Sequence, residues 1–146
     1  MENLSTATTN TKKIKLDFKE SKYATGRRKR SIAKVWVKKG SGNIYVNGIK
    51  MNEYFKRPVH QIIVSRPLEI SEVRTSYDVR CFVKGGGLSG QAGAIILGIS
   101  KALISHNQDL KKNLKKDKLT TRDSRVVERK KYGHRKARRS FQFSKR

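Results

Sequence analysis

The sequence is poor in the residues on which several protein classes depend. Its 146 residues include one cysteine and only 11 acidic side chains. The single cysteine, Cys81, excludes an internal disulfide framework and a zinc site built on cysteines, and it is predicted to be a small buried residue of a strand. Hydrophobic residues make up 35% of the chain, and no uninterrupted apolar run approaches the ~18 residues needed to cross a bilayer. The first ten residues lack the apolar segment of a secretory signal.

Positive charge is what the sequence has in excess. There are 36 Lys and Arg residues, and the formal net charge is +25. Such a charge repels itself, so the chain needs an anionic partner, and a cytosolic enzyme for a neutral metabolite is a poor fit. The charge is +11 over residues 1–57, +1 over 58–110 and +13 over 111–146. This distribution predicts one near-neutral folded body with basic extensions.

The hydrophobic pattern of the body predicts alternating strands and helices. Residues 31–47 have a strand, a turn at 40–43 and a second strand, which predicts a β-hairpin. Residues 77–84 alternate as a strand, with Val79 and Cys81 on one face. An apolar stretch then runs at helical spacing to about His106, with Ser89 as a plausible N-cap.

Shorter segments are predicted with less detail. Residues 52–55 fit a short helix, and residues 60–64 fit either a helix or a strand that Pro67 would end. Residues 108–118 suggest a short surface helix, whereas no amphipathic pattern continues beyond Arg122.

The glycine-rich loop between the last strand and the long helix has two interpretations besides an enzymatic one. Gly85, Gly87 and Gly90 match the spacing G-x-G-x-x-G of a dinucleotide site. That site also needs an acidic residue at the end of a second strand, and Asp109 is followed only by lysines. The remaining interpretations are close packing of strand and helix, and contact of a nucleic-acid phosphate with exposed loop N–H groups. The loop residues predicted to contact phosphate are Gly86, Gly87, Ser89 and Gly90.

Two basic segments are predicted to contact nucleic acid. Four consecutive cations, at 27–30, precede the first predicted strand, and the C-terminal stretch interleaves cations with Tyr132, Phe141 and Phe143. Cations suit a phosphate backbone and aromatic rings suit exposed bases. His134 fits a polar RNA contact, since no carboxylate or nucleophile is placed to work with it. The predicted RNA contacts are Arg27, Arg28, Lys29, Arg30, Arg129, Lys130, Lys131, Arg135, Lys136, Arg138, Arg139, Phe141 and Phe143.

These features predict a small α/β body whose basic arms bind nucleic acid through phosphates. RNA is favoured over DNA because no helix-turn-helix, zinc finger or basic zipper is present to enter a major groove. Basic arms that fold on binding also suit irregular RNA. No metal site, cofactor, catalytic residue, membrane or small-molecule substrate is expected.

Four separated motifs resemble one family in the same order. They are residues 23–29 (YATGRRK), 83–94 (VKGGGLSGQAGA), 121–133 (TRDSRVVERKKYG) and 141–146 (FQFSKR). The chain from about residue 23 to its end is similar to small-subunit ribosomal protein nine of the bacterial type. Residues 1–22 lie outside the resemblance, and His134 departs from the small or apolar residue expected after Gly133.

The resemblance implies a fold and a location. The body would be an α/β sandwich like the second domain of ribosomal protein five, with a left-handed βαβ crossover. It would bind the 3′ major domain of the ribosomal RNA (rRNA) in the small-subunit head, beside neighbouring head proteins. The tail would reach the P-site tRNA, where the matching residues Ser144, Lys145 and Arg146 approach the anticodon stem-loop backbone.

The predicted organisation is a disordered or extended N-terminal arm over 1–22, a globular body over 23–121 and a basic extended tail over 122–146. The expected location is a cytoplasmic ribosome, with a mitochondrial matrix ribosome as the alternative. The expected role is structural, in translation. A free-standing RNA-binding or RNA-chaperone module is the alternative function, and it would bind many RNAs with a steep salt dependence.

Overall fold

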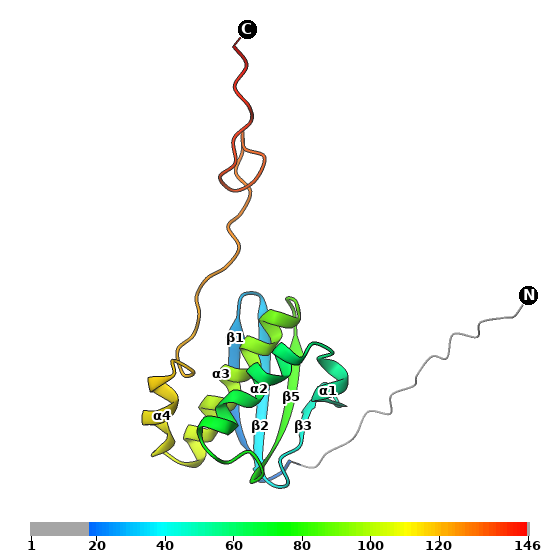
Figure 1. Ribbon diagram of the computed structural model, residues 1–146, viewed down its shortest axis with the longest axis vertical. Coiled ribbons are helices and arrows are strands. Elements are labelled where there is room, and N and C mark those ends of the chain that lie inside the picture. The colour runs from blue at the N-terminus through cyan, green and yellow to red at the C-terminus, as the bar shows by residue number, and fades with distance from the viewer. Residues whose placement is uncertain (1–17, 146) are drawn as a thin grey trace, which may run out of the picture.

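The computed structural model describes residues 18–145. Most of the predicted N-terminal arm and the predicted tRNA contact of Arg146 therefore lie outside the described residues. Along the chain the elements are β1 (Lys22–Arg28), β2 (Ser31–Lys39), β3 (Ile44–Val46), β4 (Ile49–Lys50), α1 (Met51–Tyr54), α2 (Pro58–Ile70), β5 (Tyr77–Lys84), α3 (Leu88–His106) and α4 (Leu110–Lys116) (Figure 1).

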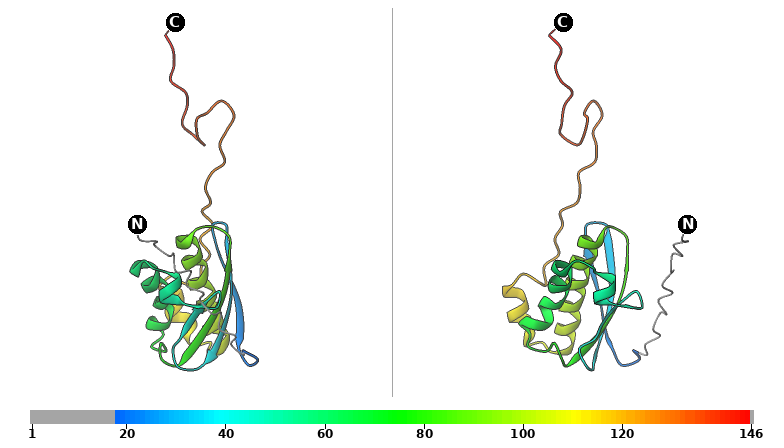
Figure 2. Two further views of the ribbon diagram at one scale, coloured as in Figure 1. Left: turned by 90° about the vertical axis from the view of Figure 1, so that its right-hand side faces the viewer. Right: turned by 45° about the vertical axis from the view of Figure 1, so that its right-hand side comes forward.

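Strand alternation produces a sheet with one buried face. Ala33, Val35 and Val37 of β2 are fully buried, whereas Lys34 between them is exposed. Val79, Cys81 and Val83 of β5 are buried in the same way. The strands form one five-stranded mixed sheet in the order β1-β2-β5-β3-β4. Helices α2 and α3 lie on one side of this sheet (Figure 2), which confirms the predicted α/β class.

The predicted hairpin over residues 31–47 is wrong, although its two strands exist. β2 pairs with β1 and β5, both antiparallel, while β3 pairs parallel with β5 and antiparallel with β4. The loop between β2 and β3 is held over the start of β5, because the Asp78 carboxylate accepts hydrogen bonds from the backbone N–H groups of Ser41 (3.0 Å) and Asn43 (2.8 Å). The chain therefore crosses over the start of β5, and β3 pairs with the edge of β5 opposite β2.

Helix α3 is the centre of the core, and glycine brings it close to β1. A side chain at Gly26 would collide with the backbone carbonyl of Ala94 in α3, and one at Gly98 would collide with Val35 of β2. Ile95, Ile99 and other apolar residues of this helix are fully buried. By length and composition α3 could span a membrane, but most of it is buried inside the protein. The close-packing interpretation of the helical glycines thus agrees with the structure.

Two further predictions need correction. Pro67 does not end its segment, because α2 continues to Ile70 with Val64 and Leu68 buried on either side of the proline. This burial stabilises a helix that lacks one backbone hydrogen bond. Ser89 is not the N-cap of α3, since the helix begins at Leu88 with Gly87 in the cap position.

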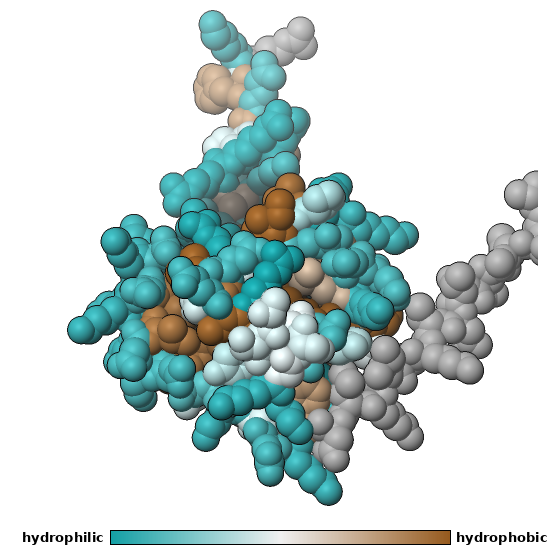
Figure 3. Space-filling model, turned by 60° about the horizontal axis from the view of Figure 1, so that its bottom comes forward, coloured by the Kyte–Doolittle hydropathy of each residue, from teal (hydrophilic) through white to brown (hydrophobic). Residues whose placement is uncertain are grey.

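Beyond its first residues, the tail that follows α4 is extended and runs away from the body. In the views of Figures 1 and 2, residues coloured orange to red run away from the sheet and helices. One loop interrupts this course: His134 and Ser140 form an isolated antiparallel bridge, and the Arg135 N–H donates to the Arg139 carbonyl at 2.7 Å. At the opposite end of the body, hydrophilic side chains surround smaller apolar areas (Figure 3).

Candidate nucleic-acid interface

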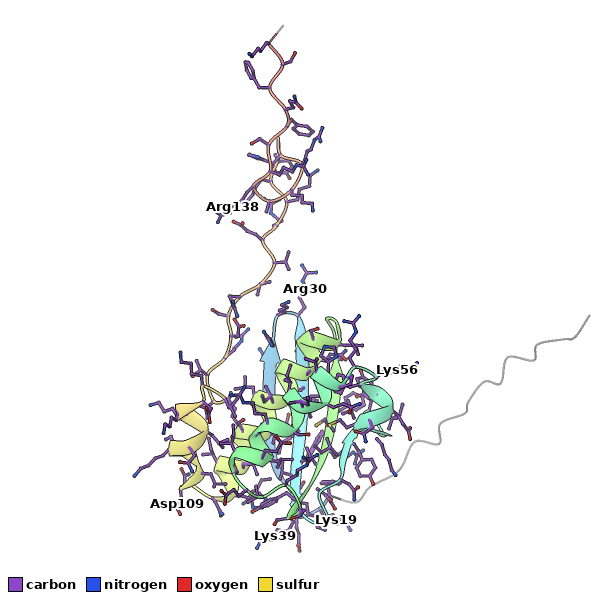
Figure 4. All side chains as sticks on the ribbon, viewed as in Figure 1. Lys19, Arg30, Lys39, Lys56, Asp109 and Arg138 are labelled. Carbon is purple, nitrogen blue, oxygen red and sulfur yellow. The ribbon has the colours of Figure 1, made fainter. Side chains whose placement is uncertain are left out.

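The four consecutive cations at 27–30 point in different directions. Arg27 lies on the sheet face away from the helices, as its cross-strand partner Ile32 does, and is exposed. Lys29 and Arg30 form the turn between β1 and β2, where Lys29 has a left-handed φ of 50°. Arg30 lies at the tip of this turn, on the side from which the tail extends (Figure 4). Three of the four cations are thus available to an external anion.

Arg28 is used inside the protein. Its side chain lies against Gly93 of α3, where a Cβ would collide with it. The guanidinium Nη2 is 3.6 Å from the Asp123 carboxylate, and Nε is buried without a hydrogen-bond partner in the described structure. The sequence prediction places Arg28 among the RNA contacts, whereas the structure places it at the root of the tail.

Asp123 joins the root of the tail to the body. Its carboxylate accepts hydrogen bonds from the Arg125 side chain, at 3.1 Å from Nε and 3.0 Å from Nη2, and from the Arg125 backbone N–H at 3.0 Å. These hydrogen bonds, with the charges of Arg125 and Arg28, lower the pKa of Asp123 from 3.8 to about 2. The group Arg28, Asp123 and Arg125, here called the root clamp, thus has an ionised carboxylate at neutral pH.

Segments distant in sequence line one groove above the body. It has a volume of about 520 Å³ and lies between the β1–β2 turn, the glycine-rich loop and the start of the tail. The groove has four cations and a single carboxylate, that of Glu128. This charge suits a phosphate backbone. Its lining residues are Lys29, Arg30, Gly86, Gly87, Val126, Val127, Glu128, Arg129 and Lys130.

The glycine-rich loop is held to the end of β2 while part of it faces the groove. Gly85 and Gly86 have left-handed φ values of 77° and 63°, and the Ser31 hydroxyl donates to the Gly85 carbonyl at 3.0 Å. A side chain at Gly86 would collide with Ser31, whereas one at Gly87 would meet open space. Both predicted interpretations of this loop, packing and an exposed phosphate contact, are compatible with its geometry.

Two of the four predicted loop contacts face the groove and two do not. Gly86 and Gly87 line it, and the N-terminus of α3, with its positive partial charge, begins beside them. Ser89 instead has its hydroxyl 3.1 Å from Nε2 of His60. Gly90 is buried against Ser31.

The loop of the tail presents rings and cations together. The Arg129 guanidinium lies 5.6 Å from the centre of the Tyr132 ring, and that of Arg135 lies 5.5 Å from the Phe141 ring. Arg138, labelled in Figure 4, pairs with Glu128 at 2.9 Å. Tyr132 is 92% exposed and therefore has no packing role in the body.

Beyond this loop the chain continues without contact to the body. Phe143 is 86% exposed, and Ser144 and Lys145 are exposed as well. The predicted tail contacts Lys131, Lys136 and Arg139 are also exposed. The structure therefore brings Arg129 and Lys130 together with Lys29 and Arg30 of the body, whereas Ser144 and Lys145 lie away from them at the end of the described chain.

Sequence reasoning missed the acidic partners of the interface. Asp123 and Glu128 organise Arg28, Arg125 and Arg138 into ion pairs. The pattern Asp-x-Arg at 123–125 is the one local signal that could have indicated such a pair. Within residues 18–145, no three His, Cys, Asp or Glu side chains are grouped to hold a metal ion.

One comparison with known proteins bears on this interface. A family model described as ribosomal protein S9/S16 matches residues 26–146. The match begins within β1 and includes the other strands, all the helices of the described structure, the groove and the whole tail.

Proposed function

The chain belongs to the ribosomal protein S9/S16 family, whose members are structural, generally non-enzymatic components of the ribosome that bind rRNA, and from this we propose how its parts divide the work. The body and the groove hold rRNA of the small-subunit head, in the 3′ major domain, beside neighbouring head proteins. The tail passes through that RNA, and its last residues contact the tRNA in the P site.

One observation carries this proposal: the tail is extended and exposed, while its root is fixed to the body. A chain of 18 residues can reach about 60 Å when fully extended. The root clamp holds the start of the tail against the body, through the pair of Arg28 with Asp123. A contact with a second RNA, distant from the body, is what such an arm can provide.

The rRNA contacts we propose are the exposed cations and rings around the groove and along the tail. Phosphate contacts position an RNA without reading its sequence, and rings stack on unpaired bases. Arg28 supports these contacts indirectly, through the root clamp. The proposed direct contacts are Arg27, Lys29, Arg30, Arg129, Lys130, Lys131, Arg135, Lys136, Arg138, Arg139, Phe141 and Phe143, with Gly86 and Gly87 of the loop.

The tRNA contacts we propose are Ser144, Lys145 and Arg146, toward the backbone of the anticodon stem-loop. Because the attraction is to phosphates, it is independent of the anticodon. A few charge-assisted contacts at one end of a chain contribute a few kcal/mol at most. The tail end therefore adjusts how firmly the tRNA is held and how well the frame is maintained, without being indispensable.

Deletion of residues 144–146 tests the tRNA contact. Small subunits should still assemble, but P-site tRNA should dissociate faster from them in a filter-binding assay. The matched control is Lys145→Arg, which retains the charge and should behave as the parent. Truncated subunits that hold P-site tRNA as tightly as the parent would show that the tail end has no such role.

The second candidate, a free-standing RNA-binding or chaperone module, is favoured by the excess of charge alone. Sedimentation separates the two: a ribosomal component stays with small subunits in high salt, whereas a loosely bound module is released. We place the ribosome in a bacterial cytoplasm, with the mitochondrial matrix as the alternative. Fractionation of the source cells, followed by detection of this chain in small subunits, would decide between the compartments.

A further inference from the structure

The sheet face opposite the helices carries a cluster of aromatic rings. We call this surface, formed by the outward side chains of β1, β2, β5 and β3, the open sheet face. Cross-strand pairing places Tyr23 beside Trp36, Trp36 beside Arg80, and Arg80 beside Tyr45. The rings of Tyr23 and Trp36 lie 5.2 Å apart at 43°. None of the described elements lies on this side of the sheet (Figure 2).

These rings are accessible. Tyr23 is 48% exposed and Phe82 is 55% exposed, and Trp36 and Tyr45 are half-buried. On the helical side of the same strands, Val35, Val37 and Cys81 are at most 1% exposed. The outward rings therefore do not serve the core, and a cluster of exposed rings on a basic surface indicates a binding site.

Cations alternate with the rings. Lys34 pairs across the strands with Phe82, and Ile32 lies between Arg27 and Lys84. All three of these cations are exposed. The one carboxylate of this face on β5, Asp78, already accepts hydrogen bonds from the loop between β2 and β3. The face thus presents rings and positive charge, and its carboxylate on β5 is engaged in hydrogen bonds within the protein.

This combination favours RNA over a protein as the occupant. Lysine is depleted from the buried centre of protein–protein interfaces, because its ammonium group is costly to desolvate. Rings stacked with bases and flanking cations near phosphates are instead the usual means of binding single-stranded nucleic acid. A continuous RNA duplex does not fit, because its bases are already stacked on one another.

We propose that the open sheet face binds an unpaired stretch of RNA, whose bases stack on Tyr23, Trp36 and Phe82 and whose phosphates lie near Arg27, Lys34 and Lys84. The inference rests on the proposed function, because the RNA would be an unpaired segment of the rRNA held by the groove and tail. It adds a second place of contact with bases, on the rigid sheet of the body rather than on the extended tail.

Trp36 provides a direct test because it is the only tryptophan of the chain. The full chain is titrated with three labelled probes at one salt concentration: a short single-stranded oligouridylate, an abasic ribose-phosphate strand of equal length, and an RNA duplex. Trp36 emission should be quenched by the single strand and should stay unchanged with the other two. Fluorescence anisotropy of each probe reports total binding, including binding to the tail.

Variants separate the open sheet face from the rest of the surface. Tyr23→Ala combined with Phe82→Ala should weaken the binding measured by Trp36 quenching by at least about tenfold, since one stacked base contributes about that much. Ile62→Ala removes an apolar side chain of α2 that is at least as exposed, on the other side of the sheet, and should leave quenching unchanged. Circular dichroism confirms that each variant is folded.

Two results would contradict the proposed stacking of bases on the open sheet face. Binding of the oligouridylate without a change in Trp36 emission, or equal quenching by the abasic strand, would overturn stacking on this face. The proposed rRNA binding by groove and tail would then stand, because anisotropy would still report it.

Assembled subunits provide a second, independent test. A photoreactive p-benzoylphenylalanine at position 82 should crosslink to rRNA. A crosslink only to a neighbouring protein, or only to residues 1–17 of this chain, would show a different occupant. Normal incorporation of the chain in that case would leave the proposed ribosomal role intact.

Discussion

The body of this chain is ordered by many contacts within the chain, whereas the tail has few such contacts. In the body, α3 and the sheet bury Val35, Ile95, Ile99 and Leu103 completely, and the order comes from contacts within the chain. In the tail, Tyr132 and Phe143 are almost fully exposed, and internal order is limited to one small loop and a few ion pairs. A substitution should therefore change stability in the body and binding in the tail, and the root clamp is where both properties meet.

The largest effect on stability is expected from a cavity in the body. Leu103→Ala removes a fully buried side chain of α3 and should lower the free energy of unfolding by roughly 2–5 kcal/mol. Phe143→Ala removes a larger, 86% exposed side chain from the tail and should change it by less than about 0.5 kcal/mol. Urea denaturation of both variants measures the difference. Similar losses in the two would mean that the tail packs on the body.

A smaller loss is expected where the backbones of strand and helix meet. Gly26→Ala places a methyl group against the backbone of α3, which cannot yield as a side chain can, and should cost about 1–3 kcal/mol. Gly87→Ala, in open space at the start of α3, should cost about 1 kcal/mol at most, through the poorer helix cap. Thermal unfolding followed by circular dichroism compares the two. Equal tolerance of both substitutions would contradict the close approach of α3 to β1.

The tail should respond to charge rather than to volume. Arg129→Gln with Lys130→Gln removes two groove cations, so the slope of log affinity for rRNA against log salt should fall by about 1–2. Stability should stay within about 0.5 kcal/mol. Arg66→Gln with Lys101→Gln removes two exposed cations from the helices and is the matched control. An equal change of slope in the control would mean that binding depends on net charge alone.

The smallest effect is expected at the root clamp. Because the folded state lowers the pKa of Asp123 from 3.8 to about 2, the clamp contributes fully above about pH 4 and is lost as the pH falls toward 2. A carboxyl NMR titration of Asp123 should show a midpoint near 2. Asp123→Asn should accelerate trypsin cleavage at Arg122 and Arg125 at neutral pH, whereas Asp117→Asn should not. Unchanged cleavage in Asp123→Asn would show that the clamp does not restrict the tail root.

The elements that sequence predicted well are those whose pattern is complete within one segment. The alternation at Val79, Cys81 and Val83 and the helical spacing through α3 depend only on near neighbours along the chain. The family resemblance is confirmed by the match over residues 26–146. The strand β1 was missed, because Gly26 and the cations beside it obscure its alternation.

The wrong predictions concern places where residues distant in the sequence determine the structure. Asp78 of β5 fixes the loop after β2, so the strand that should have completed a hairpin pairs elsewhere. Pro67 remains inside α2 because Val64 and Leu68 are buried around it. In the interface, the predicted RNA contacts of the basic segments stay predictions, and Arg28 is the one cation among them that the structure uses inside the protein. Its partner Asp123 is far from it in the sequence, at the start of the tail, and no local sequence pattern joins the two residues.

Cys81 has a consequence for experiments on this chain. It lies on β5, the middle strand of the sheet, is 1% exposed, and burial raises the pKa of its thiol. A thiol reagent needs the exposed thiolate, so it reacts only after the sheet has opened. The rate at which Cys81 is labelled therefore reports how often the core opens. A comparison of this labelling rate between the free protein and assembled subunits would measure how much bound RNA slows the opening of the sheet.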